Sequence, residues 1–367
     1  MSSAFEAVPG AVVDDAGLQH LGSPFREQRL LAEGRAVAPL DDRSVLAVSG
    51  EDRLTWLDSL VSQAISRLVP GESTEMLVLD PQGRVEHAAA VVDDGAVTWL
   101  IVDRADAGPL LAWLTRMRFR LRVDPRDASE EFSVIGGTAS ALASVTPAAP
   151  HDVSLVWVDP WPGVAVGGWG YAPADPHPAQ DRDWSEAIVT ADERQRIADL
   201  AAQGGLELAG LAAADALRIA AWRPRRSDID ERTIPHELDW LRTAVHLSKG
   251  CYRGQETVAK VHNLGHPPRR LVSLQLDGSG SVLPSPGAPV RAGDDVVGEV
   301  RASALHFEEG PIALAVVRRS TPADAELTVE TADGVIAAAQ EVVVPPEAGA
   351  TANVPRLTRL SRRPLAT

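Results

Sequence analysis

The nine residues Ser248-Lys249-Gly250-Cys251-Tyr252-Arg253-Gly254-Gln255-Glu256 gather residue types that are rare elsewhere in the chain. They include the only cysteine, one of the two lysines and one of the two tyrosines. Other positive charges are arginine, apart from Lys260 close by. A lysine provides a compact ammonium that rotates and exchanges its proton, unlike the rigid fork of arginine. The concentration of rare types predicts that this stretch, called here the signature loop, is central to fold and function.

The signature loop has the composition of a tight turn that delivers a thiol to the start of a helix. Its two glycines permit sharp turns and close backbone approach, and residues 255–261 have helical character that Gly265 can end. The thiolate is the reactive form of cysteine and is favoured by nearby cations. We therefore expect Lys249 and Arg253 to activate Cys251. The alternative is that the cysteine is a small buried apolar residue.

Length and composition restrict the class of protein. The chain has 367 residues, 45% of them hydrophobic, and a formal net charge of −16, which predicts a globular protein of two or three domains. An acidic chain is a poor binder of nucleic acid or acidic membranes. One cysteine excludes an internal disulfide, a cysteine-rich zinc site and a cluster held by this chain's thiolates alone. With no signal peptide and no bilayer-spanning stretch, we expect a cytoplasmic protein.

The order of patterns along the chain predicts two αβ units and a barrel. Strand-like segments at 45–48, 76–79, 85–92 and 97–102 surround a helical apolar face that starts at Leu54. A second unit begins near Phe132, with strands at 153–158 and 164–167 and helices at 191–203 and 207–217. From Leu271 onward, short strands with Gly and Pro turns predict a small β-barrel.

Residues 116–123 alternate arginine with apolar residues. This alternation predicts a strand with one guanidinium face and one apolar face. The arginine face suits phosphates or a polyglutamate tail. The alternative, and the commoner role of a charge run, is a solvated face neutralised by neighbouring carboxylates.

Histidines and arginines also gather upstream and downstream of the signature loop. The spacing of His236, His246, His262 and His266 does not match helical metal ligation, so no protein-held metal is predicted. The compact cationic segment 223–226 suits bidentate capture of a carboxylate or phosphate, and a self-neutralised surface loop is the alternative. Nucleotide-binding and serine-hydrolase motifs are absent from the sequence.

The signature loop resembles the K-G-C-Y-x-G-Q-E signature of the YgfZ family of folate-binding proteins. This family is related to the glycine cleavage T-protein, an aminomethyltransferase, and to mitochondrial factors that mature iron-sulfur proteins. Weaker similarities occur in the expected order, at Ser49-Gly50-Glu51-Asp52-Arg53, at Leu79-Asp80-Pro81-Gln82-Gly83-Arg84-Val85, at Leu217-Arg218-Ile219, at Pro235-His236-Glu237-Leu238 and at Arg269-Arg270-Leu271.

The resemblance implies an α+β, T-protein-like cloverleaf of two ferredoxin-like αβ domains and a C-terminal small β-barrel. The expected divisions are a loose leader at 1–18, αβ domains at 19–130 and 131–268, the barrel at 269–345 and a disordered tail at 346–367. The implied ligand is tetrahydrofolate or a derivative. The implied role is to assemble or repair iron-sulfur client proteins, including an enzyme that modifies tRNA, through transient contacts.

The resemblance also implies site residues, with departures from the T-protein pattern. Cys251 is the expected functional thiol, with Lys249 and Tyr252 beside it and Gly250, Arg253, Gly254, Gln255 and Glu256 completing the loop. The pterin-holding Glu of T-proteins has no counterpart in Gly167-Gly168-Trp169-Gly170-Tyr171, and Ala220 replaces a second Glu. The expected folate contacts are Arg218, Glu237, Trp222, Trp240 and His87.

These departures leave the activity open between an accessory protein and a folate-dependent aminomethyl or one-carbon transferase. A scaffold with an empty cavity is the third alternative.

Overall fold

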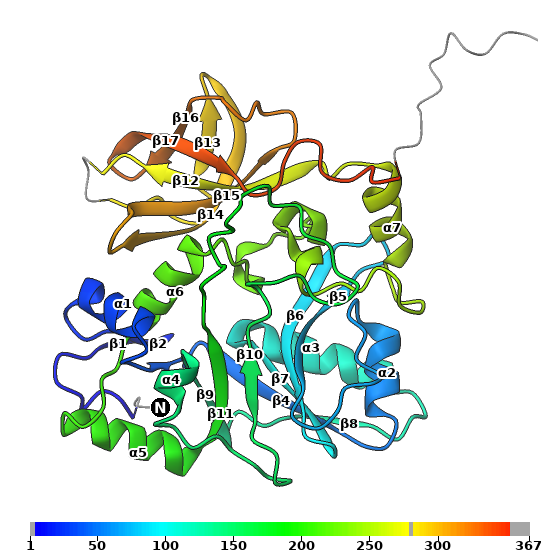
Figure 1. Ribbon diagram of the computed structural model, residues 1–367, viewed down its shortest axis with the longest axis vertical. Coiled ribbons are helices and arrows are strands. Elements are labelled where there is room, and N and C mark those ends of the chain that lie inside the picture. The colour runs from blue at the N-terminus through cyan, green and yellow to red at the C-terminus, as the bar shows by residue number, and fades with distance from the viewer. Residues whose placement is uncertain (1–3, 279–281, 353–367) are drawn as a thin grey trace, which may run out of the picture.

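Two open sheets and one closed barrel organise the chain, and Figure 1 shows the barrel at one end of the molecule. The structure is a computed structural model that describes residues 4–278 and 282–352. The prediction of an α+β chain with a small C-terminal barrel is confirmed. None of the helices in these two ranges is both long and apolar enough to cross a membrane.

The larger open sheet is antiparallel and has five strands in the order β5-β6-β7-β4-β8. Helices α2 and α3 cover one face, where their apolar side chains bury Val78, Ala89 and Leu100. The other face turns toward the smaller sheet (Figure 1). The elements are β4 (Arg43–Ser49), α2 (Arg53–Leu60), β5 (Ser73–Leu79), β6 (Val85–Asp93), β7 (Val97–Asp103), α3 (Arg104–Met117) and β8 (Asp124–Asp127).

The smaller open sheet has four strands in the order β10-β11-β9-β3. Helix α5 starts where the Thr190 hydroxyl accepts a hydrogen bond from the Glu193 amide at 3.2 Å, the cap that this spacing favours. The elements are α1 (Pro24–Ala32), β3 (Ala38–Pro39), β9 (Phe132–Gly137), α4 (Ala139–Leu142), β10 (Val156–Val158), β11 (Ser185–Thr190), α5 (Ala191–Ala202) and α6 (Leu211–Ala220).

The expected loose leader is wrong for the described part of residues 1–18. Strand β1 (Val12–Asp14) pairs with β2 (Gly17–His20), and Phe5 and Leu18 are fully buried against α5 and the smaller sheet. Short apolar runs separated by Gly and Asp have no helical or strand period, so the sequence gives no signal of this packing.

The prediction of an arginine-rich strand at 116–123 is also wrong. Helix α3 continues to Met117, and an exposed turn follows, in which Phe119 has a positive φ of 49° and is 88% exposed. Arg118 pairs with Asp124 at 3.3 Å, and Arg122 pairs with Asp52 at 2.9 Å. The alternation of arginine and apolar residues therefore spans a helix C-terminus and the turn after it. Cations are favourable at a helix C-terminus, so these arginines do not require a strand.

Six strands close the barrel in the order β12-β15-β14-β13-β16-β17, with a core of small aliphatic side chains. Residues 346–352 pack back on the molecule, with Ala348 buried and the Thr351 amide donating to the His262 carbonyl at 3.0 Å, so the expected disordered tail is wrong for this part. The rest of that prediction, 353–367, lies outside the described residues. The strands are β12 (Arg269–Leu276), β13 (Pro289–Ala292), β14 (Asp295–His306), β15 (Gly310–Arg318), β16 (Leu327–Thr331) and β17 (Gly334–Val342).

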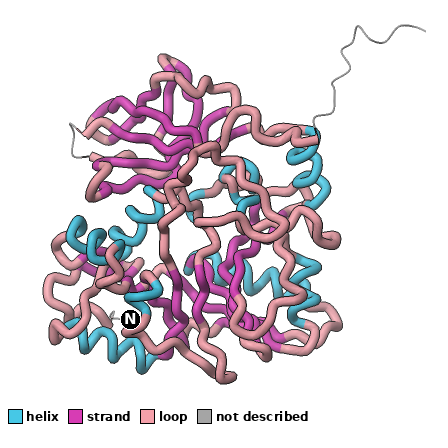
Figure 2. Tube along the Cα trace, in the orientation of Figure 1, coloured by secondary structure: helices cyan, strands magenta, loops and turns pink. Residues whose placement is uncertain are grey.

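Two long segments with little regular structure lie between the sheets and the barrel (Figure 2). One joins β10 to β11 and contains residues 164–167, which do not form the predicted strand; β10 pairs with β11 instead. The other joins α6 to α7 (Gln255–Leu264) through three short 3-10 helices, η1 (Arg226–Asp228), η2 (Pro235–Leu238) and η3 (Trp240–Arg242). Residues of both segments line the cavity described next.

Candidate functional site

A cavity of about 300 Å³ lies where the two open sheets face each other, beside α6 and the segment that follows it. Ala88, Ala90, Ile101 and three tryptophans supply apolar wall, which suits a planar ring. The charged wall is balanced, with six arginines and six carboxylates: Arg43, Arg182, Arg218, Arg223, Arg225, Arg226, Asp42, Glu75, Asp103, Asp159, Glu186 and Asp215.

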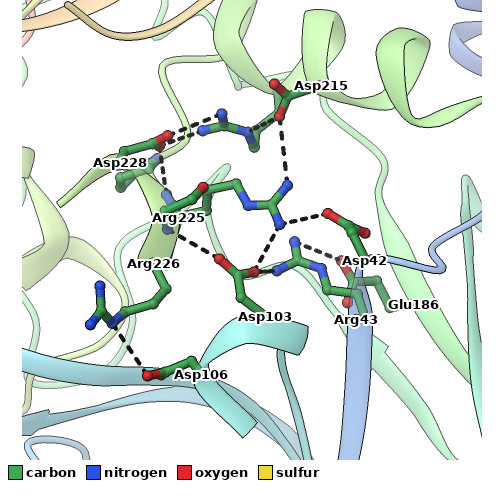
Figure 3. A network of polar contacts seen from close by, with 12 residues as sticks. Asp42, Arg43, Asp103, Asp106, Glu186, Asp215, Arg225, Arg226 and Asp228 are labelled. Atoms are coloured by element: carbon green, nitrogen blue, oxygen red, sulfur yellow. Dashed lines mark hydrogen bonds and ion pairs between the residues drawn. The ribbon is translucent and has the colours of Figure 1, made fainter. Parts of the chain in front are cut away.

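Arg225 crosses from the segment after α6 to the first open sheet. Its Nη2 contacts Asp42 at 2.6 Å and Asp103 at 2.9 Å, and Arg43 also pairs with Asp103 (Figure 3). Burial opposes ionisation of Asp103, but Arg43 and Arg225 outweigh it and lower its pKa to about 2. This ion-pair group joins the two αβ units at the cavity wall.

Arg218, a predicted folate contact, lines the cavity but uses its donors within the protein. The guanidinium contacts Asp215 at 2.7 Å and Asp228 at 2.6 Å, and Nη1 donates to the Arg223 carbonyl at 2.6 Å. Its role in this structure is to fix the segment that carries Arg223 and Arg225.

Trp240, a second predicted contact, also lines the cavity. Its indole N–H donates to Glu75 at 2.9 Å, so the ring has a satisfied polar edge and a fixed orientation. Glu75 is held further by Arg223 at 2.8 Å and by the Thr243 hydroxyl at 2.6 Å.

The other three predicted contacts do not line the cavity. Glu237 is fully buried and pairs with Arg269 at 2.8 Å, and Trp222 lies against the ring of His177. His87 directly precedes the cavity-lining Ala88 on β6. Alternate residues of a strand point to opposite faces, so the His87 side chain points away from the cavity. Its ring contacts Asp106 of α3 at 2.8 Å on the helix-covered face.

Glu186 is a cavity residue that the sequence patterns did not single out. It is 5% exposed, accepts a hydrogen bond from the Trp184 indole at 3.3 Å and lies 3.9 Å from Arg43. Burial raises the pKa of its carboxyl group, and Arg43 opposes this only in part. The available signal was an acidic residue inside the mostly buried strand β11, where an ionised side chain is costly.

In the signature loop, Lys249 does not reach toward the thiol. Its ammonium donates to the carbonyls of Asp58 at 2.6 Å, Val61 at 2.9 Å and Gln63 at 2.7 Å. These carbonyls lie at and just beyond the end of α2, where a helix leaves acceptors unpaired. Lys249 therefore fastens the loop to α2, and burial lowers the pKa of its ammonium.

Gly254 sets the second attachment of the loop, to the turn between β5 and β6. Its φ is +84°, and a Cβ there would lie 2.6 Å from the Asp80 carbonyl oxygen. In the facing turn, a Cβ on Gly83 would lie 2.9 Å from the Thr257 Cβ. Two motifs that are far apart in the sequence therefore meet through a glycine-to-glycine contact that larger residues would prevent.

The remaining loop residues leave one thiol at the surface. Tyr252 is buried with its ring 5.5 Å from the Lys249 ammonium, and Arg253 pairs with Glu86 at 2.7 Å. The Gln255 side chain donates to the Lys249 carbonyl at 3.3 Å, and α7 starts at this residue, as predicted. The exposed positions of the loop are Ser248, Gly250, Cys251 and Glu256.

Within residues 4–278 and 282–352, no group of three or more His, Cys, Asp or Glu side chains is arranged to hold a metal ion. His236 is fully buried and contacts the Val258 carbonyl at 3.1 Å. Burial lowers its pKa to about 3, so it is a neutral core residue.

Comparisons with known proteins agree with this architecture. Residues 269–346 match the glycine cleavage T-protein C-terminal barrel domain. An aminomethyltransferase of Rippkaea orientalis (strain PCC 8801 / RF-1) is 28% identical over 308 residues, 79% of this chain and 81% of the relative. The mitochondrial iron-sulfur cluster assembly factor IBA57 homolog of Mycosarcoma maydis is 26% identical over 266 residues, 68% of this chain and 59% of the relative.

A solved structure has the same fold over nearly the whole chain. The glycine cleavage system aminomethyltransferase T of Bartonella henselae superposes with a TM-score of 0.69 at 17% identity, covering 92% of this chain and 94% of that one. The T-protein-like fold predicted from the sequence is confirmed. The barrel match, the relatives and the shared fold are all similarities of this chain to the T-protein-like aminomethyltransferase superfamily.

Proposed function

We propose that this T-protein-like chain is a YgfZ-type, folate-binding accessory protein that supports assembly or repair of iron-sulfur enzymes, including one that modifies tRNA. The observation that carries the proposal is the state of Cys251. It is the only thiol of the chain, and it is exposed on a loop whose neighbouring residues fasten it to α2 and to the turn between β5 and β6.

An exposed thiol on a fixed support suits contact with another protein. A single thiolate cannot hold an iron-sulfur cluster alone, so any cluster has to be shared with a client protein or be bound only transiently. Tyr252 and Gln255 keep the backbone on either side of Cys251 in place, and the described residues include no group of three or more His, Cys, Asp or Glu that would compete for the client's cluster.

The cavity supports tetrahydrofolate, or a derivative, as the small-molecule ligand. Its volume is within the range of small-molecule sites, roughly 300–1,000 Å³. Trp157, Trp184 and Trp240 offer aromatic wall for a bicyclic ring, and partly exposed Arg226 offers a cation for a carboxylate tail. Folate binding is tested by calorimetric titration with tetrahydrofolate and with its 5-formyl form, and absence of heat with both contradicts it.

A second candidate function is a folate-dependent aminomethyl or one-carbon transferase. The whole-chain fold shared with an aminomethyltransferase favours it. This candidate predicts consumption of methylene-tetrahydrofolate or its formation from an aminomethyl donor, with a rate that does not depend on Cys251.

Complementation of a deletion strain separates the two candidates. We expect Cys251→Ala to fail to restore iron-sulfur enzyme activity, whereas Ser248→Ala, which alters another exposed residue of the same loop, restores it. If Cys251→Ala fully restores iron-sulfur enzyme activity, the proposed role of the thiol is contradicted. Turnover of folate by that variant favours the transferase.

The proposed place of action is the cytoplasm, because a lone free thiol suits a reducing compartment. The proposed partners are folate and iron-sulfur client proteins. Direct binding of nucleic acid is not proposed, since the chain has a formal net charge of −16.

A further inference from the structure

Arg270 is a fully buried arginine on β12, which Figure 1 shows in the C-terminal barrel. The residues at alternate positions after it, Val272, Leu274 and Leu276, belong to the barrel core. Side chains at alternate positions of a strand share a face. The Arg270 side chain therefore points into the barrel, at the end where β12 begins.

Only one nitrogen of the Arg270 guanidinium has hydrogen-bond partners in the described part of the chain. Nη2 donates to the Thr321 carbonyl at 3.0 Å and to the Gln340 amide oxygen at 3.1 Å. Nε and Nη1 are completely buried and have no partner there. Burial lowers the pKa of Arg270, and exposed Glu347 opposes that shift. The guanidinium stays charged at neutral pH, but none of these hydrogen bonds reaches a carboxylate.

The turn that covers Arg270 contains a further unpaired group. Thr321 is 4% exposed, and its hydroxyl oxygen is completely buried without a partner among the described residues. The Gln340 side chain fixes this turn, because its amide nitrogen donates to the Pro322 carbonyl at 3.0 Å and to the Ala325 carbonyl at 3.1 Å. The unpaired groups at this end of the barrel are therefore the N–H donors of one guanidinium and one hydroxyl.

Two less buried arginines of the barrel strands are each neutralised by carboxylates. Arg269 pairs with Asp230 at 2.6 Å and with Glu237 at 2.8 Å. Arg301 of β14 pairs with Asp230 at 2.8 Å. An ion loses its hydration on burial, and a counter-ion ordinarily compensates that loss. Arg270 is more deeply buried than either and lacks such a counter-ion in the part of the chain that the structure describes.

The unpaired groups define the kind of ligand that they can bind. Guanidinium N–H groups only donate and a hydroxyl can also donate, so the matching ligand is a negatively charged acceptor. Gln340 lines a groove on the barrel together with Asp324 and Glu326, whose carboxylates disfavour anions of high charge. The close covering of the free donors further restricts the ligand to a small ion, such as a halide or formate.

We infer that Arg270 and Thr321 form an anion site inside the end of the barrel, which binds one small monovalent anion as the counter-ion of the buried guanidinium. The ion enters from the groove, and its entry requires a shift of the Gln340 side chain or of the turn that this side chain fixes. Neither residue of the site lines the cavity between the open sheets, so the inference goes beyond the proposed function and does not depend on folate binding.

The test measures the midpoint of thermal unfolding at constant ionic strength, with sodium gluconate replaced stepwise by sodium chloride or sodium formate. Gluconate is too large for the covered site and keeps the general screening of charges constant. An anion that binds only the folded protein stabilises it, so we expect the wild-type midpoint to rise by roughly 2 °C at ten times the dissociation constant. The chloride and formate series show whether the site takes a halide or a carboxylate.

Arg270→Met separates a counter-ion site from a purely structural role of the arginine. Methionine is an unbranched apolar side chain that needs no counter-ion, so in gluconate we expect this variant to unfold within about 2 °C of wild type or above it. Chloride and formate are expected to leave its midpoint unchanged. Arg291→Gln, which breaks the exposed ion pair of Arg291 with Glu330 in the same barrel, is the matched control and is expected to keep the full anion response.

A second variant keeps the test decisive if Arg270→Met does not fold. Thr321→Val keeps the shape of the side chain and removes the hydroxyl donor, so we expect the anion affinity to fall about 5- to 10-fold. Unchanged affinity in Thr321→Val, an equal anion response in Arg270→Met, or no response of wild type to either small anion overturns the assignment. A deficit of Arg270→Met that is the same in gluconate, chloride and formate also overturns it, because it shows a structural role only.

Discussion

The signature loop is one continuous segment whose side chains mostly hold the loop itself, whereas the cavity wall brings together charged residues from both open sheets and from the segments around them. In the loop, one exposed thiol remains after Lys249, Tyr252 and Arg253 have found partners. In the cavity, one buried carboxylate remains after its neighbours have paired. In both regions the group without a close partner is the candidate for chemistry, and the predictions below test whether the surrounding residues are only supports.

The largest expected effect is at the two glycines of the signature loop. Gly254→Ala places a Cβ 2.6 Å from a backbone oxygen at a φ of +84°, so we expect a loss of about 4 kcal/mol in the free energy of unfolding. Gly250→Ala meets no atom within 4 Å and is expected to change it by less than about 0.5 kcal/mol. Urea unfolding measures both, and equal effects would contradict the proposed attachment to the turn between β5 and β6.

The two lysines of the chain form the next pair. Lys249→Met leaves three carbonyl groups without their ammonium partner, and we expect a loss of about 3 kcal/mol in the free energy of unfolding. Lys260→Met, on the exposed face of α7, is expected to cost less than about 0.5 kcal/mol. If Lys249→Met has the wild-type midpoint of urea unfolding but loses the reactivity of Cys251, then Lys249 acts on the thiol and does not stabilise the attachment of the loop to α2.

The same contrast explains what the sequence could predict. The loop, the start of α7 at Gln255 and the barrel strands depend on short-range patterns, so composition and turn residues were sufficient. The cavity depends on residues such as Arg43 and Glu186 that meet only when two sheets face each other, which no local pattern records. The predicted contacts Glu237 and His87 do not line this cavity, for related reasons. Glu237 pairs with Arg269 instead, and the His87 ring contacts Asp106 on the opposite, helix-covered face of β6.

Asp103 tests the charge balance of the cavity wall. Its pKa is about 2 in the folded protein against an ordinary 3.8, so the stability it contributes is present above pH 3.8 and lost as pH falls through about 2. The difference corresponds to about 2 kcal/mol. We expect Asp103→Asn to lose this amount at pH 7 and less than half of it near pH 2, measured by urea unfolding. The same change at Asp295, an exposed residue of β14, is the control, and a loss independent of pH would contradict the ion-pair interpretation.

The smallest expected effect is at Arg253, and it bears most directly on the thiol. The sequence predicts that this cation activates Cys251, but the structure pairs it with Glu86 at 2.7 Å, and both side chains are 35% exposed. A screened pair of this kind contributes about 0.5 kcal/mol or less, so Arg253→Gln is expected to change the alkylation rate of Cys251 by less than about twofold. Glu86→Gln removes the ion-pair partner of Arg253 and leaves the Arg253 guanidinium charged. This variant is expected to raise the alkylation rate of Cys251 only if Arg253 can then approach the thiol. A tenfold decrease in Arg253→Gln would restore the activating role, because a decrease of that size requires a direct interaction between the cation and the thiolate.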